Sequence, residues 1–103
     1  MVPSKVRIGS MVYDVILSEA PLLDGRECAG KIGFSEGKIY IRKPCEEFAE
    51  AAMRQTLQHE ILHGILEERG IEDMIDPEFL EDFVDQMARG LLDVEYIEEV
   101  AKE

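Results

Sequence analysis

Three residues in the middle of the chain have the types and the spacing of a hydrolytic metal site. His59 and His63 are four residues apart and Glu60 follows the first of them, so the segment reads HExxH. Residues four apart on a helix project from the same face, roughly 5–6 Å apart at Cβ, so both imidazoles can bind one ion. Glu60 is turned about 100° from His59, beside the ion, where its carboxylate can polarise a bound water. The segment therefore predicts a zinc-hydrolase site.

A zinc ion held by two histidines needs a third protein ligand and a fourth position for water. The chain has no third histidine, so a carboxylate must complete the site. Glu81 and Asp85 share one face of a helix expected downstream, and Ala88 on that face is small enough for close packing. In this arrangement Glu81 binds zinc, and Asp85 accepts a hydrogen bond from the non-ligating nitrogen of His59. Asp82 and Asp85 are the alternatives for direct ligation.

Each of these residues also has a simpler interpretation without a metal. A histidine on an apolar helix is often a hydrogen-bonded core residue, and Glu81 with Asp85 would be an exposed acidic pair. Two arguments favour the metal. The Glu60 carboxylate is costly beside a buried apolar stretch unless it has a role or reaches solvent. Like charges four residues apart also repel one another unless a cation is near. We therefore expect one Zn²⁺ per chain.

The residues that must position this site begin with a β-rich segment, 1–44. Alternating apolar and polar residues predict two hairpins with strands at 6–8, 11–17, 30–34 and 38–42. The segment between the hairpins reads as a loop, with a helical turn around Leu22 and Leu23 as a further candidate. In the last strand Ile39 and Ile41 are expected to face the core. The other face of that strand then carries Lys38, Tyr40 and Arg42.

A helix over 45–70 is expected to carry HExxH. Pro44 ends the preceding strand, and Gly70 is the predicted stop of the helix. Between Leu57 and Leu66 this helix is apolar nearly all round, so we expect it to be central and buried.

A second helix is expected over 76–100, with Asp76 as N-cap and Pro77 in its first turn. It carries an apolar stripe made by Phe79, Leu80, Phe83, Val84, Met87, Leu91 and Val94. Strands followed by helices predict an α+β fold, in which a small antiparallel sheet of about four strands packs on two long helices.

The composition predicts a single domain over residues 1–103 and limits its partners. The net charge is −12, and residues 46–103 contain eighteen Asp and Glu against four Lys and Arg. Such a surface repels phosphate backbones, so a nucleic-acid partner is not expected. The acids are either a solvated helical face or a surface that recognises a basic partner.

The same sequence predicts a cytoplasmic protein without membrane association. No apolar signal-peptide segment is found near the first residues, and no apolar run is long enough to span a bilayer. Cys28 and Cys45 are too few for a disulfide framework and are not spaced as CxxC, so free thiols in a reducing compartment are expected. Neither cysteine is an obvious metal ligand.

The segment Glu81-Asp82-Phe83-Val84-Asp85-Gln86-Met87-Ala88 is similar to the glutamate-helix pattern of the gluzincins, which include thermolysin-like peptidases and the ImmA/IrrE family. With HExxH before it, the chain resembles the short phage and prophage members of the ImmA/IrrE-like group over residues 28–92. In that group a hairpin ending in an I-x-I strand directly precedes a helix reading HEILH. Val84 departs from the pattern, because a small residue is usual at its position.

This resemblance implies a minimal zincin-like fold with zinc bound by His59, His63 and Glu81. It also implies that Glu60 is the general base and that a peptide substrate lies antiparallel to the strand Lys38 to Arg42, at the rim of the cleft.

The implied function is a zinc metallopeptidase that hydrolyses peptide bonds in a protein or peptide, such as a regulatory protein. A zinc-bound water activated by Glu60 would be the nucleophile. Larger gluzincins stabilise the transition state with a residue from a further subdomain, and here Tyr96 or Arg89 would have to substitute. Weak or latent activity is therefore expected. The alternative is a catalytically inactive zincin-fold module that binds a basic protein partner, but such a module has no need of Glu60.

Overall fold

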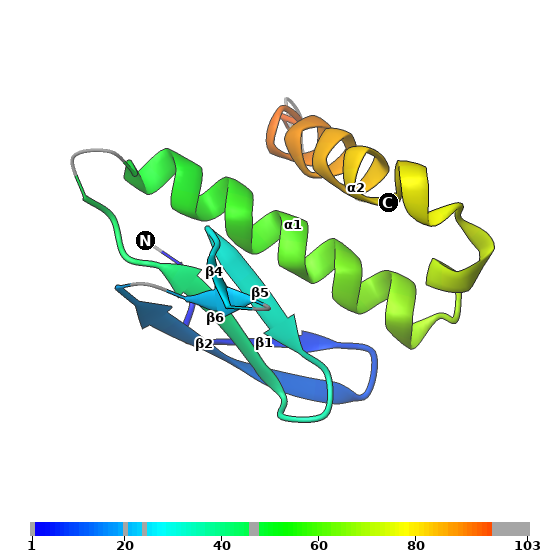
Figure 1. Ribbon diagram of the computed structural model, residues 1–103, viewed down its shortest axis with the longest axis horizontal. Helices are drawn as coiled ribbons and strands as arrows, with labels where there is room; N and C mark the ends of the chain where they lie inside the picture. The colour runs from blue at the N-terminus through cyan, green and yellow to red at the C-terminus, as the bar shows by residue number, and fades with distance from the viewer. Residues whose placement is uncertain (1, 20, 24, 46–47, 96–103) are drawn as a thin grey trace, which may run out of the picture.

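The computed structural model describes residues 2–19, 21–23, 25–45 and 48–95. Its strands are β1 Lys5–Ile8, β2 Met11–Ser18, β3 Leu22–Leu23, β4 Arg26–Glu27, β5 Gly30–Gly33 and β6 Lys38–Arg42. Its helices are α1 Glu50–Glu68, the short 3₁₀ helix η1 Glu72–Met74 and α2 Pro77–Leu92. Figure 1 shows α1 lying across one face of the sheet and α2 packed on the other side of α1. The α+β class predicted from the sequence is confirmed.

The main sheet has four strands in the order β1-β2-β6-β5. The two predicted hairpins are present, since β1 pairs with β2 and β5 pairs with β6, both antiparallel. The hairpins join through β2 and β6, which run parallel with Val15 opposite Ile39. The prediction of an antiparallel sheet is therefore wrong at this junction, and the sheet is mixed. Between the hairpins, Leu22 and Leu23 form strand β3, which pairs with β4, and not a helical turn.

The core lies between the sheet and α1. Ile39 and Ile41 of β6 are fully buried, as their alternation predicts, because β6 is an inner strand covered by α1. They pack with Ile8, Tyr13, Met53 and Leu57. Gly64 allows α1 to approach β1 closely, since a Cβ atom at this position would lie 2.6 Å from Cδ1 of Ile8.

Helix α1 is shorter than the predicted 45–70. Cys45 and Phe48 form an isolated antiparallel bridge with N···O distances of 2.8 and 3.1 Å, and α1 begins only after it, at Glu50. At the other end Gly70 terminates the helix as predicted. Its φ is +68°, its N–H donates to the Glu67 carbonyl, and the N–H of Ile71 donates to the Leu66 carbonyl. These two bonds form a Schellman motif.

Helix α2 begins where the sequence indicates. A carboxylate oxygen of Asp76 accepts a hydrogen bond from the Glu78 N–H at 3.0 Å, and Pro77 occupies the first turn. Within the described residues the helix ends at Leu92, and the final part of the predicted range 76–100 lies outside them. None of the described helices combines the length and the apolar character needed to cross a bilayer.

Candidate metal centre

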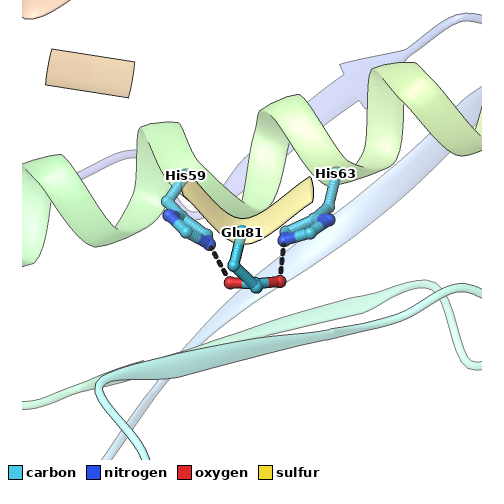
Figure 2. Close-up of side chains that lie close together, drawn as sticks. All are labelled: His59, His63 and Glu81. Atoms are coloured by element: carbon cyan, nitrogen blue, oxygen red, sulfur yellow. Dashed lines mark hydrogen bonds and ion pairs between the residues drawn. The ribbon is translucent and has the colours of Figure 1, made fainter. Parts of the chain in front are cut away.

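His59, His63 and Glu81 converge at the contact between α1 and α2. The Nε2 atom of His59 lies 3.2 Å from one carboxylate oxygen of Glu81, and the Nε2 atom of His63 lies 2.9 Å from the other (Figure 2). The two imidazole centroids are 5.0 Å apart. One ligand atom from each of the three side chains lies within 4.8 Å of the others, so the group could hold a metal ion.

The local fold explains this convergence. One helical turn separates the two histidines, so α1 presents both rings to α2. On α2, Val84 and Ala88 are fully buried against α1, and Glu81 lies one turn before them near the same face. Their packing holds the two helices close enough for the Glu81 carboxylate to reach both rings.

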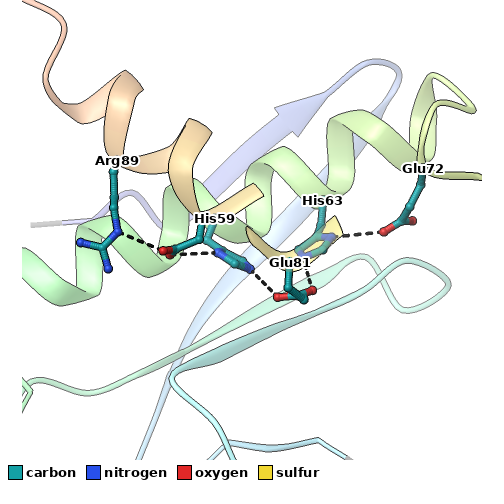
Figure 3. A network of polar contacts seen from close by, with 6 residues as sticks. His59, His63, Glu72, Glu81 and Arg89 are labelled. Carbon is teal, nitrogen blue, oxygen red and sulfur yellow. Dashed lines mark hydrogen bonds and ion pairs between the residues drawn. The ribbon is translucent and has the colours of Figure 1, made fainter. Parts of the chain in front are cut away.

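Two further carboxylates contact the outer nitrogens of the imidazoles. Glu72 of η1 lies 3.2 Å from Nδ1 of His63, and Asp85 of α2 lies 3.7 Å from Nδ1 of His59 (Figure 3). Arg89 in turn donates from Nε to Asp85 at 3.0 Å and thereby lowers the pKa of that carboxyl. Metal-binding histidines commonly have this arrangement, in which a carboxylate on one ring nitrogen orients the other nitrogen toward the ion.

The hydrogen-bonding capacity of the imidazoles favours a cation at this position. A neutral imidazole carries one N–H, yet each ring has a carboxylate near both of its nitrogens. His63, with a carboxylate oxygen within 3.2 Å of each nitrogen, therefore needs a second proton or a metal ion, and His59 has the same arrangement with a longer distance of 3.7 Å to Asp85. A single divalent ion between the rings and Glu81 meets this need for both histidines at once. Two imidazole nitrogens and one carboxylate are also a donor set found in catalytic zinc sites.

Glu60 is buried beside these ligands, with an exposed fraction of 7%. Burial is the main reason that the pKa of its carboxyl is raised to about 7; the charge of His63 opposes this rise, and the charge of Glu81 adds to it. A carboxyl that titrates near neutral pH at the wall of a cavity is suited to accepting a proton and returning it.

The ligand group opens into a cavity of about 670 Å³. Its walls are formed by β5 with the residues on either side of it, by α1, and by the acids of η1 and α2. Phe34 and Phe48 supply apolar surface, while Gln55 and Thr56 of α1 supply polar groups. Glu60, His59 and His63 line the same cavity, so a molecule bound there would contact the candidate ligands and the candidate base together.

No protein-family model, curated protein or solved structure with which the chain was compared matches it. The chemistry assigned to this site therefore depends on its geometry and on the sequence motifs that form it.

The strand expected at the rim of the cleft is not at the rim. Strand β6 pairs with β2 on one side and with β5 on the other, so it has no free edge for a substrate. Lys38, Tyr40 and Arg42 do not line the cavity. The Tyr40 hydroxyl donates to Glu36 at 3.1 Å, and the Arg42 guanidinium lies over the Phe48 ring. The edge strand beside the cavity is β5, the hairpin partner of the predicted strand.

Arg89 and Tyr96 are the two residues considered above for transition-state stabilisation. Arg89 lines the cavity, but its Nε is bonded to Asp85, and Figure 3 shows it on the side away from Glu81. Tyr96 lies outside the described residues.

Glu72 is a site residue that the sequence analysis missed. It lies in a segment expected to be only a linker, nine residues after His63. The signal that could have identified it is Gly70. A helix that stops there reverses the chain, which returns the next acids to the last turns of α1.

Both cysteines are free. Cys28 lines the cavity, where burial, followed by the charge of Glu60, raises the pKa of its thiol. It donates a weak hydrogen bond to the Pro21 carbonyl at 3.5 Å. A thiol kept protonated in this way is a poor metal ligand, and Cys28 is not in the converging group.

Proposed function

We propose that this protein is a zinc-dependent metallopeptidase in which His59, His63 and Glu81 bind zinc and Glu60 is the general base. The observation that carries the proposal is the pair of imidazoles, each with one nitrogen directed at Glu81 and the other at a supporting carboxylate. The HExxH segment and the gluzincin-like segment at residues 81–88 support the same assignment. A bound zinc ion would supply a Lewis acid and lower the pKa of a water at its open coordination position.

Glu60 has the position and the acidity for the proton transfers. Its carboxylate would remove a proton from the attacking water and deliver that proton to the nitrogen of the leaving amine. Burial raises the pKa of this carboxyl to about 7. The charge of bound zinc would lower this pKa, so the value of about 7 describes the metal-free protein.

Strand β5 is the element best placed to hold an extended peptide. It is the edge strand of the sheet, it contacts α1, and Gly30, Lys31 and Ile32 line the cavity. A peptide could add to this edge through main-chain hydrogen bonds and direct one side chain toward Phe34 and Phe48. The substrate expected is a protein or peptide segment in extended conformation, such as part of a regulatory protein.

The proposal is tested by cleavage of a peptide library, followed by mass spectrometry, with the zinc-loaded protein. We expect cleavage by wild type and a decrease of at least ~100-fold for Glu60→Gln, since general acid–base catalysis contributes about 10²–10⁴-fold. Glu68→Gln, an exposed change on the same helix, is the matched control and should cleave as wild type does. Zinc content is measured in parallel.

Two results would overturn the proposal. One is stoichiometric zinc without cleavage of any peptide in the library. The other is cleavage by Glu60→Gln at the rate of wild type, which would show that another protein or another group performs the reaction.

A further inference from the structure

One flank of α2, beside the face that packs on α1, is apolar and uncovered. It consists of Phe79, Phe83, Met87 and Leu91, whose exposed fractions range from 42% to 58%. We call these four residues the outer face of α2. Their spacing of four residues places them in one stripe along the helix. Single exposed apolar residues are ordinary, but a continuous stripe of large ones marks a surface that binds something.

Acidic residues border this stripe. Glu78, Asp82 and Asp93 are exposed, and no ion pair involves their carboxylates in the part of the chain that the structure describes. The cation within α2, Arg89, is already bonded to Asp85. The border of the outer face therefore carries negative charge that no cation among residues 48–95 neutralises.

We propose that the outer face of α2 is a docking surface for an amphipathic helix of another protein, with basic residues flanking its apolar side. Phe79 and Leu91 are separated by about 18 Å along the helix axis, a length that a partner helix of about 12 residues would cover. Large aromatic, Met and Leu side chains are typical of surfaces that receive an apolar helix face. The acidic border would attract basic flanks and reject acidic ones.

Two other occupants of the outer face are conceivable, a second copy of this chain and the segment 96–103, and charge argues against both. A second copy of this chain would bring the same acidic border against itself, and each copy carries a net charge of −12. The segment 96–103 contains three glutamates and one lysine.

The test uses a synthetic 16-residue helical peptide with leucines on one face and lysines beside them, titrated into the full chain by fluorescence anisotropy. A second peptide of identical composition, with its leucines spread around the helix, separates docking from general attraction of a basic peptide to an acidic protein. We expect the first peptide to bind at least ~10-fold more tightly than the second. The double substitution Phe83→Ser/Met87→Ser should remove this preference.

Circular dichroism and two further variants serve as controls for the peptide titration. Both substituted residues are exposed, so the variant is expected to fold, which circular dichroism checks. Val12→Ser changes an equally exposed apolar residue on β2 and should leave peptide binding unchanged. Asp82→Asn/Asp93→Asn should weaken binding of the amphipathic peptide and reduce its dependence on salt.

The proposal fails if the two peptides bind equally or if Phe83→Ser/Met87→Ser binds as wild type does. It also fails if sedimentation shows a dimer that this double substitution dissociates, since the occupant would then be a second copy. Tighter peptide binding after Tyr96→Ser/Ile97→Ser would identify the segment 96–103 as the occupant and overturn it in the same way.

Discussion

The two helices differ strongly in how much of their apolar surface is buried. Helix α1 covers the sheet and contributes to a shared core whose members are Ile8, Tyr13, Ile39, Ile41, Met53 and Leu57. Helix α2 buries only Val84 and Ala88 among its described side chains and leaves its outer face exposed. Most of the apolar burial that stabilises the fold therefore comes from the sheet and α1, while α2 adds a thin layer.

The candidate metal centre joins these two regions. His63 comes from the well-packed region, and its side chain is 9% exposed, whereas the Glu81 side chain from α2 is 70% exposed. A metal ion bound by both would attach α2 to the rest of the molecule. Because binding to the folded arrangement stabilises it, zinc should increase the stability of α2 more than that of the sheet.

The largest expected effect comes from shortening a buried side chain in each of the two regions. Ile41→Ala removes a fully buried side chain of β6 and should lower the free energy of unfolding by about 2–5 kcal/mol. Val84→Ala removes two methyl groups from the contact between the helices and should cost about 1.5 kcal/mol. Urea unfolding measures both values.

Hydrogen exchange then shows where the loss occurs. We expect Ile41→Ala to reduce protection throughout the sheet and α1, and Val84→Ala to reduce it chiefly in α2. Equal loss of protection across the whole chain in Val84→Ala would mean that α2 is part of the same cooperative unit, and the comparison would be wrong.

The next effect concerns Glu60, the acid placed within the well-packed region. Its pKa of about 7 in the folded protein lies above the ordinary value of 4.5, so its ionisation opposes folding. In the metal-free protein this contribution to stability is complete below pH 4.5 and is lost as the pH rises through 7. Because glutamine cannot ionise, Glu60→Gln should be more stable than wild type by about 3 kcal/mol at pH 8 and nearly equal to it at pH 4.

Thermal or urea unfolding across this pH range in the presence of a chelator measures the difference, and Glu68→Gln is the control for loss of one negative charge. A stability gain that does not depend on pH would mean that burial of the Glu60 carboxylate is not its cause.

The smallest effect compares the carboxylates that support the two histidines. Glu72→Gln should weaken zinc binding by about 10–100-fold, because it removes the charged acceptor for Nδ1 of His63. Asp85→Asn should have a smaller effect, since Asp85 lies 3.7 Å from His59 and is shared with Arg89. Calorimetric titration of each variant with zinc ranks them. A larger loss for Asp85→Asn would show that the α2 region orients the site more strongly than its packing indicates.

Local sequence signals predicted the elements well and their long-range pairing poorly. Alternation identified both hairpins, and Asp76 with Pro77 fixed the start of α2, because these signals act within a few residues. The parallel pairing of β2 with β6 was missed, since nothing in either strand specifies a partner so far away in the sequence. The start of α1 was placed too early because the bridge between Cys45 and Phe48 depends on a local chain path that composition does not show.

The same contrast between local signals and long-range pairing applies to the residues of the site. The spacing of His59 and His63 reflects helix geometry, and Glu81 was chosen for the helix face that it shares with Asp85 and Ala88. The structure brings the three side chains together. The rim strand was assigned wrongly because the outer position in the hairpin depends on which strand joins the rest of the sheet. The apolar stripe of α2 was visible in the sequence, but periodicity does not distinguish a face that packs in the core from one that is exposed.

The most direct test of the proposed zinc site is calorimetric titration of the metal-free protein with zinc. We predict saturable binding of one zinc per chain for wild type and for the control Glu78→Gln, an exposed change on α2. Under the same conditions Glu81→Gln should show no stoichiometric binding, since it removes the ligand that α2 contributes. The account would be contradicted by wild type that binds no zinc, or by Glu81→Gln that binds zinc as tightly as wild type does.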